Sequence, residues 1–395
     1  MAFRIIFSMI VFIILFNGIT DFYFYKRAIC RFTSKKIIRQ IHFYLSGFFV
    51  LLNIWLAYEF TSPTADPTSI IYVWSILVYF VFYLPKLVFM VVSLPELIFK
   101  KVKFFSIVGV FLGVMVACGL IWGAAFGRFQ FVTRAVDVHS DRLPKAFEGY
   151  KIVQFSDTHL GNFGHSDRIV DELVERINAQ HPDMIVFTGD LVNTKATEID
   201  RFQATLRKLK AKDGVYSILG NHDYGDYVYW KTDADHQNNN TRLIQKEAAL
   251  GWKLLRNETV FLRKQNDSIA IIGVENWGEP PFHQYGNMKK AVSGLHYKGY
   301  KLLLTHNPEH WRQEIVPHFD IDLSLSGHTH AWQMAFRLGK ERYSPAVLKY
   351  KNWGGLYAEN GKSIYVNEGI GYVLYPMRFG TGPEITVITL KGGRK

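Results

Sequence analysis

The sequence predicts an N-terminal bundle of four transmembrane helices followed by an α/β domain. Three observations carry this prediction. Four apolar stretches, each near the roughly 20 residues that a bilayer requires, occupy the first third of the chain. From residue 151 onward, short apolar runs typical of buried strands alternate with runs of helical spacing. Short polar motifs follow five of the predicted strands. At 395 residues, the chain is long enough for two or more domains.

The predicted domains are a transmembrane domain over 1–125, a linker over 126–149 and the α/β domain over 150–395. The four predicted spans cover residues 3–25, 41–60, 70–92 and 104–122. The first stretch could instead be a signal peptide, but only Arg4 precedes its apolar run and no small-residue cleavage site follows. The alternative for all four stretches is a set of buried helices in a soluble protein, which their length and number disfavour.

The charges around these spans predict their orientation. Lys and Arg gather at 26–39 and 100–103, whereas 61–69 contains neither. Because cytoplasmic loops carry the Lys/Arg excess, we expect an integral, multi-pass protein of the plasma or inner membrane whose C-terminal domain is extracytoplasmic. The basic residues that follow the fourth span weaken this orientation; they are Arg128, Arg134, Arg142 and Lys145.

The net charge of +12 is unevenly distributed along the chain. Residues 1–145 hold 15 Lys/Arg against 6 Asp/Glu, which leaves 31 against 28 in the remainder. The basic excess therefore flanks the apolar stretches. A nucleic-acid-binding groove would require it in the C-terminal part, so we expect no nucleic-acid partner.

Within the C-terminal part, periodicity predicts strands and helices in alternation. The predicted helices cover 166–179 and 199–209, and the polar, Asn-rich stretch 227–241 is expected to be an exposed insertion or loop. The predicted strands cover 151–156, 184–188, 215–219, 270–274, 301–305 and 321–325.

Five polar fragments follow these strands. Open α/β sheets bind ligands at the carboxyl ends of their strands, so we expect the fragments to meet there. Both cysteines, Cys30 and Cys118, precede this part, so a metal site would use His, Asp, Glu or Asn. Taken singly, the fragments also suit turns, a helix N-cap or a surface histidine. They are Asp157-Thr158-His159, Gly189-Asp190, Gly220-Asn221-His222-Asp223, Thr305-His306-Asn307 and Gly327-His328-Thr329-His330.

In this order, the fragments match the pattern D-x-H, G-D, G-N-H-[DE], H and G-H-x-H. The chain thereby resembles the calcineurin-like metallophosphoesterases over about residues 151–390. The tail from Gly369-Ile370-Gly371 to Pro383-Glu384 is similar to the membrane-anchored bacterial branch. The resemblance implies an α/β sandwich of two mixed sheets flanked by helices, and a metal-dependent phosphoric ester hydrolase.

The resemblance also implies roles for nine residues. Asp190 would bridge two divalent metal ions, His222 would face the substrate, and Asp223 would orient His222, which makes these last two the predicted catalytic residues. Imidazole and carboxylate ligands without thiolate suit Mn, Fe or Zn better than Ca or Mg. The first ion would be held by Asp157, His159 and His330, and the second by Asn221, His306 and His328.

For the substrate, we expect a phosphate ester or pyrophosphate of a lipid or lipid-linked molecule, with membrane lipids as partners. Four spans exceed what anchoring requires, because one span already inserts effectively irreversibly. The segment after the last span also carries Phe126, Arg128 and Phe129, of types that favour the membrane interface. The alternatives are a membrane phosphodiesterase that acts on soluble nucleotides or nucleic acid, and a non-catalytic membrane sensor that retains the metal site.

Overall fold

The computed structural model describes residues 2–62, 69–99, 103–164, 166–280 and 282–393. The chain divides into two compact units. The membrane unit comprises Met1–Phe126 together with a returning segment, Val373–Phe379. The α/β unit comprises Gly127–Tyr372 and Gly380–Lys395. Most of the segment 61–69 between the second and third predicted spans, and Lys100 and Lys101 of the second basic cluster, lie outside the described residues.

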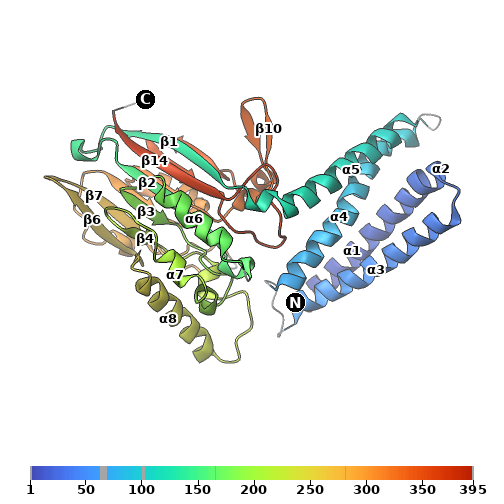
Figure 1. Ribbon diagram of the computed structural model, residues 1–395, viewed down its shortest axis with the longest axis horizontal. Coiled ribbons are helices and arrows are strands. Elements are labelled where there is room, and N and C mark those ends of the chain that lie inside the picture. The colour runs from blue at the N-terminus through green and yellow to red at the C-terminus, as the bar shows by residue number, and fades with distance from the viewer. Residues whose placement is uncertain (1, 63–68, 100–102, 165, 281, 394–395) are drawn as a thin grey trace. The chain divides into compact units, whose positions relative to one another are not determined.

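The membrane unit contains helices α1 (Ala2–Phe24), α3 (Lys36–Thr61), α4 (Ile70–Ser93) and α5 (Phe104–Ala125), which run side by side (Figure 1). Among the described residues, three stretches are long and apolar enough to cross a membrane. They are Lys36–Glu59, Ile70–Leu97 and Phe104–Phe129. Helix α1 coincides with the predicted first span but is not among these three. That four helices cross the membrane therefore stays a prediction.

Two turns of the membrane unit are joined by a buried carboxylate. A π-helix (Tyr25–Ile29) and α2 (Cys30–Phe32) continue α1, and a 3₁₀-helix (Leu94–Leu97) continues α4. Glu96 is fully buried, forms an ion pair with Arg31 and accepts the backbone N–H of Ser106 at 2.6 Å. The turn after α1 and the turn between α4 and α5 consequently lie at the same end of this unit.

Small residues allow α4 and α5 to pack closely. A Cβ atom at Gly113 of α5 would lie 2.9 Å from the backbone oxygen of Pro85, and one at Gly109 would lie 3.2 Å from the Cα of Phe89. In membranes, helix association depends on such close backbone approach, because lipid supplies no hydrophobic driving force between helices. The glycines of α5 thus set the distance between these two helices.

An ion pair lies in the interior of the membrane unit. The Lys86 Nζ atom of α4 is 2.6 Å from Asp21 Oδ1 of α1, and the Tyr83 hydroxyl donates to Asp21 Oδ2 at 2.8 Å. Asp21 and Lys86 are 8% and 5% exposed. Ionisable side chains are expensive in such surroundings unless they are paired.

Replacing Lys86 with methionine is expected to destabilise the membrane unit by about 3–5 kcal/mol, because the Asp21 carboxylate remains buried without its counter-charge. Thermal unfolding of the full chain in detergent measures the effect. The control is Lys26→Met, which removes an exposed lysine. Adding Asp21→Asn to Lys86→Met should restore much of the loss. A double variant as unstable as the single one would show that packing, and not the unpaired charge, causes the effect.

The returning segment Val373–Phe379 packs on α4 and α5. The Arg378 backbone N–H donates to the Gly123 oxygen at 3.2 Å, and the rings of Tyr375 and Phe80 meet edge to face with centroids 5.5 Å apart. The Phe379 ring likewise meets that of Trp122 at 6.1 Å. The polypeptide therefore passes between the membrane unit and the α/β unit three times, after Phe126 and at both ends of this segment.

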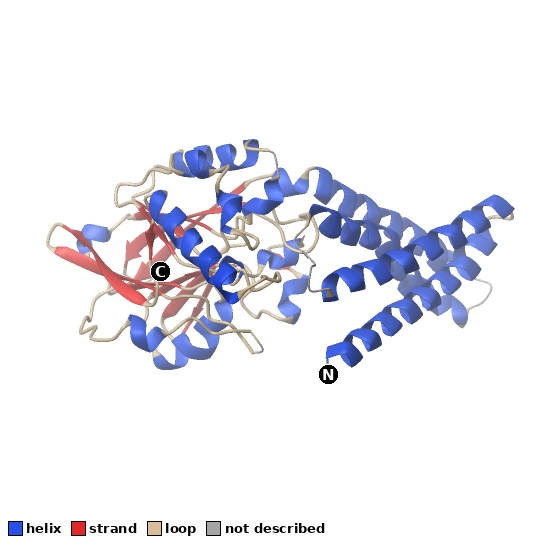
Figure 2. Ribbon diagram, turned by 90° about the horizontal axis from the view of Figure 1, so that it is seen from below, coloured by secondary structure: helices blue, strands red, loops and turns tan. Residues whose placement is uncertain are grey.

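The α/β unit contains two six-stranded sheets (Figure 2). In spatial order, the first sheet is β1 (Val132–Ser140), β14 (Glu384–Gly392), β2 (Lys151–Phe155), β3 (Met184–Phe187), β4 (Val215–Ser217) and β5 (Lys253–Leu254). The second is β12 (Gly355–Glu359), β13 (Lys362–Val366), β9 (Leu323–Ser326), β8 (Lys301–Leu304), β7 (Asp267–Gly273) and β6 (Glu258–Lys264). Each sheet combines parallel and antiparallel neighbours, because β14 is antiparallel to β2, β12 to β13, and β6 to β7. The prediction of two mixed sheets is confirmed.

Alternation along the strands builds a layered core. Met184 and Val186 of β3 belong to a cluster that includes Leu302 of β8 in the other sheet, so this cluster lies between the sheets. The intervening Ile185 and Phe187 belong to a second cluster with α6 (Arg168–Asn178). Each central strand is therefore buried on both faces, which explains why its sequence is continuously apolar.

Three of our predictions for this unit were wrong. The expected linker 126–149 contains β1, which pairs in parallel with β14 and is exposed along one face. The helix expected at 199–209 is reduced to a 3₁₀-helix (Ala196–Ile199) and the short α7 (Gln203–Leu206). Most of the expected loop 227–241 belongs to α8 (Asp233–Ala249), which the Thr232 side chain caps. Few residues of α8 are buried, so its polar sequence resembled a loop.

Helix α8 carries a buried carboxyl group, Glu247. The Ser217 hydroxyl of β4 donates to Glu247 Oε2 at 2.6 Å, and Glu247 is fully buried. Burial, together with the charge of Asp223, raises the pKa of Glu247 to about 8. At neutral pH the fold therefore favours the protonated acid.

This shift predicts a pH dependence of stability. A carboxyl whose folded pKa is raised stabilises the fold fully below its unfolded pKa, and that stability is lost as the pH rises toward 8. Glu247→Gln is expected to flatten the fall in unfolding temperature between pH 5 and pH 8, measured against the unsubstituted chain at each pH. Glu175→Gln, at an exposed position of α6, is the matched control. An unchanged slope in Glu247→Gln would contradict the assignment.

Candidate metal centre

The five polar fragments meet where the two sheets present the carboxyl ends of their parallel strands. Three fragments follow β2, β3 and β4 of the first sheet, and two follow β8 and β9 of the second. The structure brings the seven predicted metal ligands together there. They are Asp157, His159, Asp190, Asn221, His306, His328 and His330.

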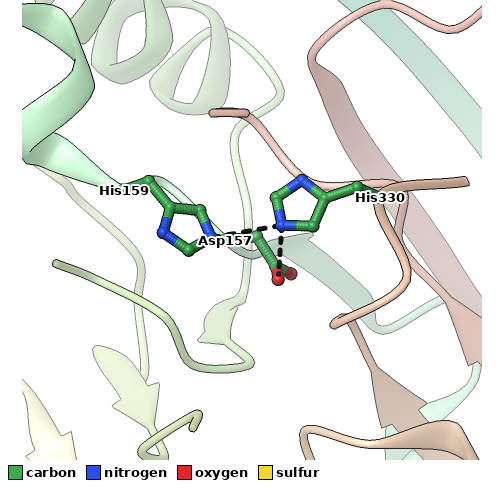
Figure 3. Close-up of side chains that lie close together, drawn as sticks. All are labelled: Asp157, His159 and His330. Atoms are coloured by element: carbon green, nitrogen blue, oxygen red, sulfur yellow. Dashed lines mark hydrogen bonds and ion pairs between the residues drawn. The ribbon is translucent and has the colours of Figure 1, made fainter. Parts of the chain in front are cut away.

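Asp157, His159 and His330 form the first group of possible ligands (Figure 3). His330 Nε2 lies 3.2 Å from Asp157 Oδ1 and 3.1 Å from His159 Nε2. The three side chains are at most 3% exposed. They come from the ends of β2 and β9, in different sheets, so the group depends on the packing of one sheet against the other.

Asp190, His306 and His328 form the second group. His306 Nε2 lies 3.2 Å from Asp190 Oδ2, 3.2 Å from His328 Nδ1 and 3.1 Å from Asn221 Oδ1. His306 Nδ1 meets the backbone oxygen of Thr188 at 2.7 Å, so it carries the proton and donates. His306 Nε2 consequently faces the other members of the group.

Asp190 connects the two groups. Its Oδ2 atom lies 3.7 Å from His159 Nε2 of the first group and 3.2 Å from His306 Nε2 of the second. Its Oδ1 atom accepts the backbone N–H of His222 at 2.8 Å. This is the placement expected of a bridging carboxylate.

The arrangement of the imidazole rings favours the binding of a metal ion. Two pairs of ring nitrogens, His159 with His330 and His306 with His328, face each other at 3.1 and 3.2 Å. One proton can be shared by only two facing nitrogens. A metal ion, in contrast, can accept the lone pairs of several nitrogens together. The buried Nδ1 of His159 has no hydrogen-bond partner among the described residues, so no hydrogen bond at Nδ1 fixes the tautomer of this ring.

The electrostatics hold most of these groups in the form that binds metal. Burial lowers the pKa of His159 and, together with the charge of His306, lowers that of His328 to about 3. Burial alone would raise the pKa of Asp157, but the nearby histidines outweigh it and lower that pKa. Burial likewise opposes protonation of His306, but Asp190 and Asp157 raise its pKa to about 9. Neutral imidazoles and ionised carboxylates are the states that coordinate cations, and the carboxylates attract positive charge to His306.

The backbone at the centre is strained. Non-glycine residues rarely adopt a positive φ, and strain of this kind concentrates at functional sites. Within the described residues, five predicted ligands have a positive φ: Asp157 (52°), His159 (47°), Asp190 (61°), His328 (74°) and His330 (50°). The surrounding sheets thus hold the ligands in conformations that the local chain disfavours.

Two glycines of the motifs are required because side-chain atoms of predicted ligands lie close to their Cα atoms. A Cβ atom at Gly327 would lie 2.2 Å from Asp157 Oδ2, and one at Gly220 would lie 2.2 Å from Asp190 Oδ1. Any side chain at either position would therefore displace a predicted ligand.

The predicted role of Asp223 requires correction. Asp223 does not orient the His222 ring, whose Nδ1 instead donates to the Asn193 backbone oxygen at 2.9 Å. The Asp223 carboxylate accepts four backbone N–H groups at 2.8–3.2 Å. They belong to Asp190, Leu191, Val192 and Gly220. Asp223 thus fixes the two loops that present Asp190 and Asn221.

His222 lies beside the centre. Its ring stacks on Tyr227 with centroids 4.4 Å apart and meets the His159 ring edge to face at 4.7 Å. With His159 and Asp190 it forms a third group that could hold a metal ion. Since His222 Nδ1 donates to Asn193, only Nε2 is available to an ion or a substrate.

Two tyrosines at the centre were not predicted. The Tyr350 hydroxyl lies 3.1 Å from His328 Nε2, and the Tyr227 hydroxyl accepts from Asn221 Nδ2 at 2.9 Å. Tyr227 follows the G-N-H-D fragment by only a few residues, which is the one signal that could have indicated it. Tyr350 reaches the centre only through the fold.

Comparison with known proteins identifies the family. Residues 150–332 match the model of the calcineurin-like phosphoesterases, and residues 3–128 match that of a probable calcineurin-like phosphoesterase transmembrane domain. The metallophosphoesterase YkuE of Bacillus subtilis is 32% identical over 305 residues, which cover 74% of this chain and 99% of that protein. This chain belongs to the calcineurin-like phosphoesterase family.

Other relatives match this phosphoesterase over different shares of its length. A metallophosphoesterase of Campylobacter jejuni is 26% identical over 410 residues, covering 98% of this chain and 99% of that protein. A Bos taurus protein described as a transmembrane protein with a metallophosphoesterase domain is 32% identical over 269 residues, covering 65% of this chain and 56% of that protein. The chain is therefore a metallophosphoesterase with a membrane domain.

Proposed function

We propose that this phosphoesterase hydrolyses a phosphate ester or pyrophosphate of a lipid or lipid-linked substrate at a two-metal centre on the extracytoplasmic side of the membrane. The observation that carries the hydrolytic part is the position of Asp190 between two groups of buried ligands. Two divalent ions held there would supply four positive charges, which would attract a phosphate and lower the pKa of a water molecule.

The chain's own residues determine how much of that charge remains. Asp157, His159 and His330 would hold one ion, Asn221, His306 and His328 the other, and Asp190 both. Because Asn221 offers a neutral oxygen, only the Asp157 and Asp190 carboxylates offset the charge of the ions. An excess of positive charge is therefore left for a phosphate group. Imidazole and carboxylate ligands favour Mn, Fe or Zn, and the cysteines lie in the other unit.

His222 is positioned to give a proton to the leaving oxygen. The Asn193 backbone oxygen holds its Nδ1–H, and stacking on Tyr227 fixes the plane of the ring. When the ring is protonated, Nε2–H is left to donate to the phosphate or to its leaving group. Asp223 acts indirectly, by holding the backbone of the loops on either side.

Two features of the membrane unit support a lipid substrate and the proposed side. The polypeptide passes between the two units three times, so the α/β unit is tethered to the membrane, which raises the effective concentration of lipid phosphates around it. The contact of Arg31 with Glu96 places the turns that follow α1 and α4 at one end of this unit, which agrees with a common cytoplasmic side for their basic residues. The near-neutral charge of the remaining chain does not suit nucleic acid.

The substrate class can be tested with a hydrolysis screen of the full chain in vesicles. Phospholipids and lipid-linked pyrophosphates are compared with soluble nucleotides and a small soluble phosphodiester, with and without Mn²⁺ or Zn²⁺. We expect metal-dependent turnover that is highest for a lipid phosphate. Preference for nucleotides would instead support a phosphodiesterase of soluble substrates, and absence of turnover with bound metal would support a sensor.

The side of the membrane can be tested with a reporter fused after Lys395. A reporter that matures only in an oxidising compartment is expected to be active. An inactive fusion, together with an active cytoplasmic reporter at the same position, would reverse the proposed orientation.

A further inference from the structure

A hairpin next to the metal centre presents apolar side chains to solvent. It consists of β10 (Phe336–Leu338), β11 (Glu341–Tyr343) and the 3₁₀-helix Pro345–Leu348, and it projects from the sheets of its unit around the β10 label in Figure 1. Its exposed apolar residues include Leu338 (76%), Val347 (57%) and Leu348 (82%). We call residues 336–351 the apolar hairpin. Single exposed apolar residues are normal, but several within one short segment indicate an interaction surface.

The apolar hairpin is firmly attached to its unit. Arg342 pairs with Glu368 through Nη2 and Oε2 at 3.1 Å, and Glu368 is fully buried. The Ser344 hydroxyl donates to the Ala331 oxygen at 2.6 Å, next to the predicted ligand His330. The apolar side chains are therefore held outward by a fixed frame and do not belong to a loose loop.

The apolar hairpin also carries exposed basic side chains. Four exposed basic residues lie in it against one exposed acidic residue, Glu341. A segment with both exposed apolar and exposed basic side chains suits the boundary of an anionic bilayer, where apolar groups enter the acyl region and Lys or Arg meet phosphate groups. The four basic residues are Arg337, Lys340, Lys349 and Lys351, of which Lys349 also lies 3.8 Å from Glu279.

The chain connects the base of this hairpin to the membrane unit. A Cβ atom at Gly380 would lie 1.8 Å from the Ala335 backbone oxygen, so Ala335, which precedes β10, packs directly on Gly380. Gly380 is bonded to Phe379, whose ring meets that of Trp122 in α5. Gly380, on which the base of the hairpin packs, is therefore directly bonded to the segment that packs on α5.

The other end of the apolar hairpin reaches the metal centre. Tyr350, two residues after Leu348, lies 3.1 Å through its hydroxyl from His328 Nε2. The hairpin thus begins after one predicted ligand, His330, and ends in contact with another. A lipid bound along it would have its phosphate near the centre.

From these observations we propose that the apolar hairpin docks on the surface of an anionic bilayer, with Leu338 and Leu348 in the acyl boundary and its basic side chains on lipid phosphates. Docking would present lipid headgroups to the metal centre. Only this last consequence rests on the proposed function, because membrane docking itself requires no catalysis.

The position of Leu338 relative to the bilayer tests the proposal. Leu338→Cys is placed in a chain that also carries Cys30→Ser and Cys118→Ser, labelled with an environment-sensitive fluorophore and reconstituted in vesicles of phosphatidylcholine and phosphatidylglycerol. We expect a blue-shifted emission, quenching by lipids that carry a quencher near the headgroup, and protection from aqueous iodide. The control label at Phe261→Cys, an exposed apolar position on β6 of the same unit, should show none of these.

Each outcome decides the proposal. Iodide quenching equal to that of the control would overturn it, because the hairpin would then face water. Protection from both iodide and lipid quenchers would also overturn it, in favour of a protein partner or a second copy of the chain.

The lipid quenching should decrease in vesicles of phosphatidylcholine alone, and further with Arg337→Glu and Lys340→Glu. Quenching that is unaffected by these changes would refute the role of the basic residues. Since no turnover is measured, failure of the substrate screen leaves this result intact.

Discussion

The Asp190→Asn variant is expected to lose bound metal from both positions and to lose phosphoesterase activity. Asparagine keeps the size of the side chain and the oxygen that accepts the His222 N–H, but it removes the negative charge that both groups of ligands share. Loss of a mere supporting contact to a metal ligand lowers affinity or activity by roughly 10–100-fold, so loss of a bridging ligand should exceed about 100-fold. Elemental analysis of the purified chain and turnover of a soluble phosphodiester measure the two effects.

The matched control for this variant is Asp137→Asn, the same change at an exposed position of β1 in the same unit. It should leave two ions per chain and full activity. Unchanged metal content and turnover in Asp190→Asn would refute Asp190 as the bridging ligand. Loss of activity at full metal content would limit its role to positioning His222.

The Asp223→Ala variant is expected to destabilise the α/β unit by about 4 kcal/mol or more and to lower its affinity for metal. The substitution leaves four buried N–H groups without an acceptor, and each such group costs about 1–3 kcal/mol before relaxation. Three of these groups belong to the loop that carries Asp190 and the fourth to the loop that carries Asn221, so the ligands should become mobile. Unfolding in denaturant and metal titration measure the two effects.

Two further variants separate this role from a simple loss of charge. Asp223→Asn keeps one acceptor oxygen and should lie between the unsubstituted chain and Asp223→Ala in stability. Asp233→Ala, at the exposed start of α8, should cost well under 1 kcal/mol. If Asp223→Ala lost activity at unchanged stability and metal affinity, Asp223 would act on the reaction and not through the loops.

The sequence by itself determined the apolar helices of the membrane unit, the central strands and the residues that could hold a metal ion. Apolar stretches near bilayer length and continuous apolar strands are local signals, because each depends on residues close together in the chain. The motif fragments are local signals as well, since each directly follows a predicted apolar strand in the sequence. Asp157 and His330 could therefore be named before their meeting at 3.2 Å was known.

Only the tertiary structure decided the features that depend on distant partners. The β1 strand was missed because its sheet position comes from β14, more than 200 residues away, with Val132 opposite Glu384. The role of Asp223 was misassigned because its acceptor oxygens meet N–H groups of a loop that precedes it by about 30 residues. The returning segment Val373–Phe379 and the contact of Tyr350 with His328 likewise have no local signature. Local spacing specifies which side chains can do the chemistry, whereas packing between distant segments specifies which atoms they meet.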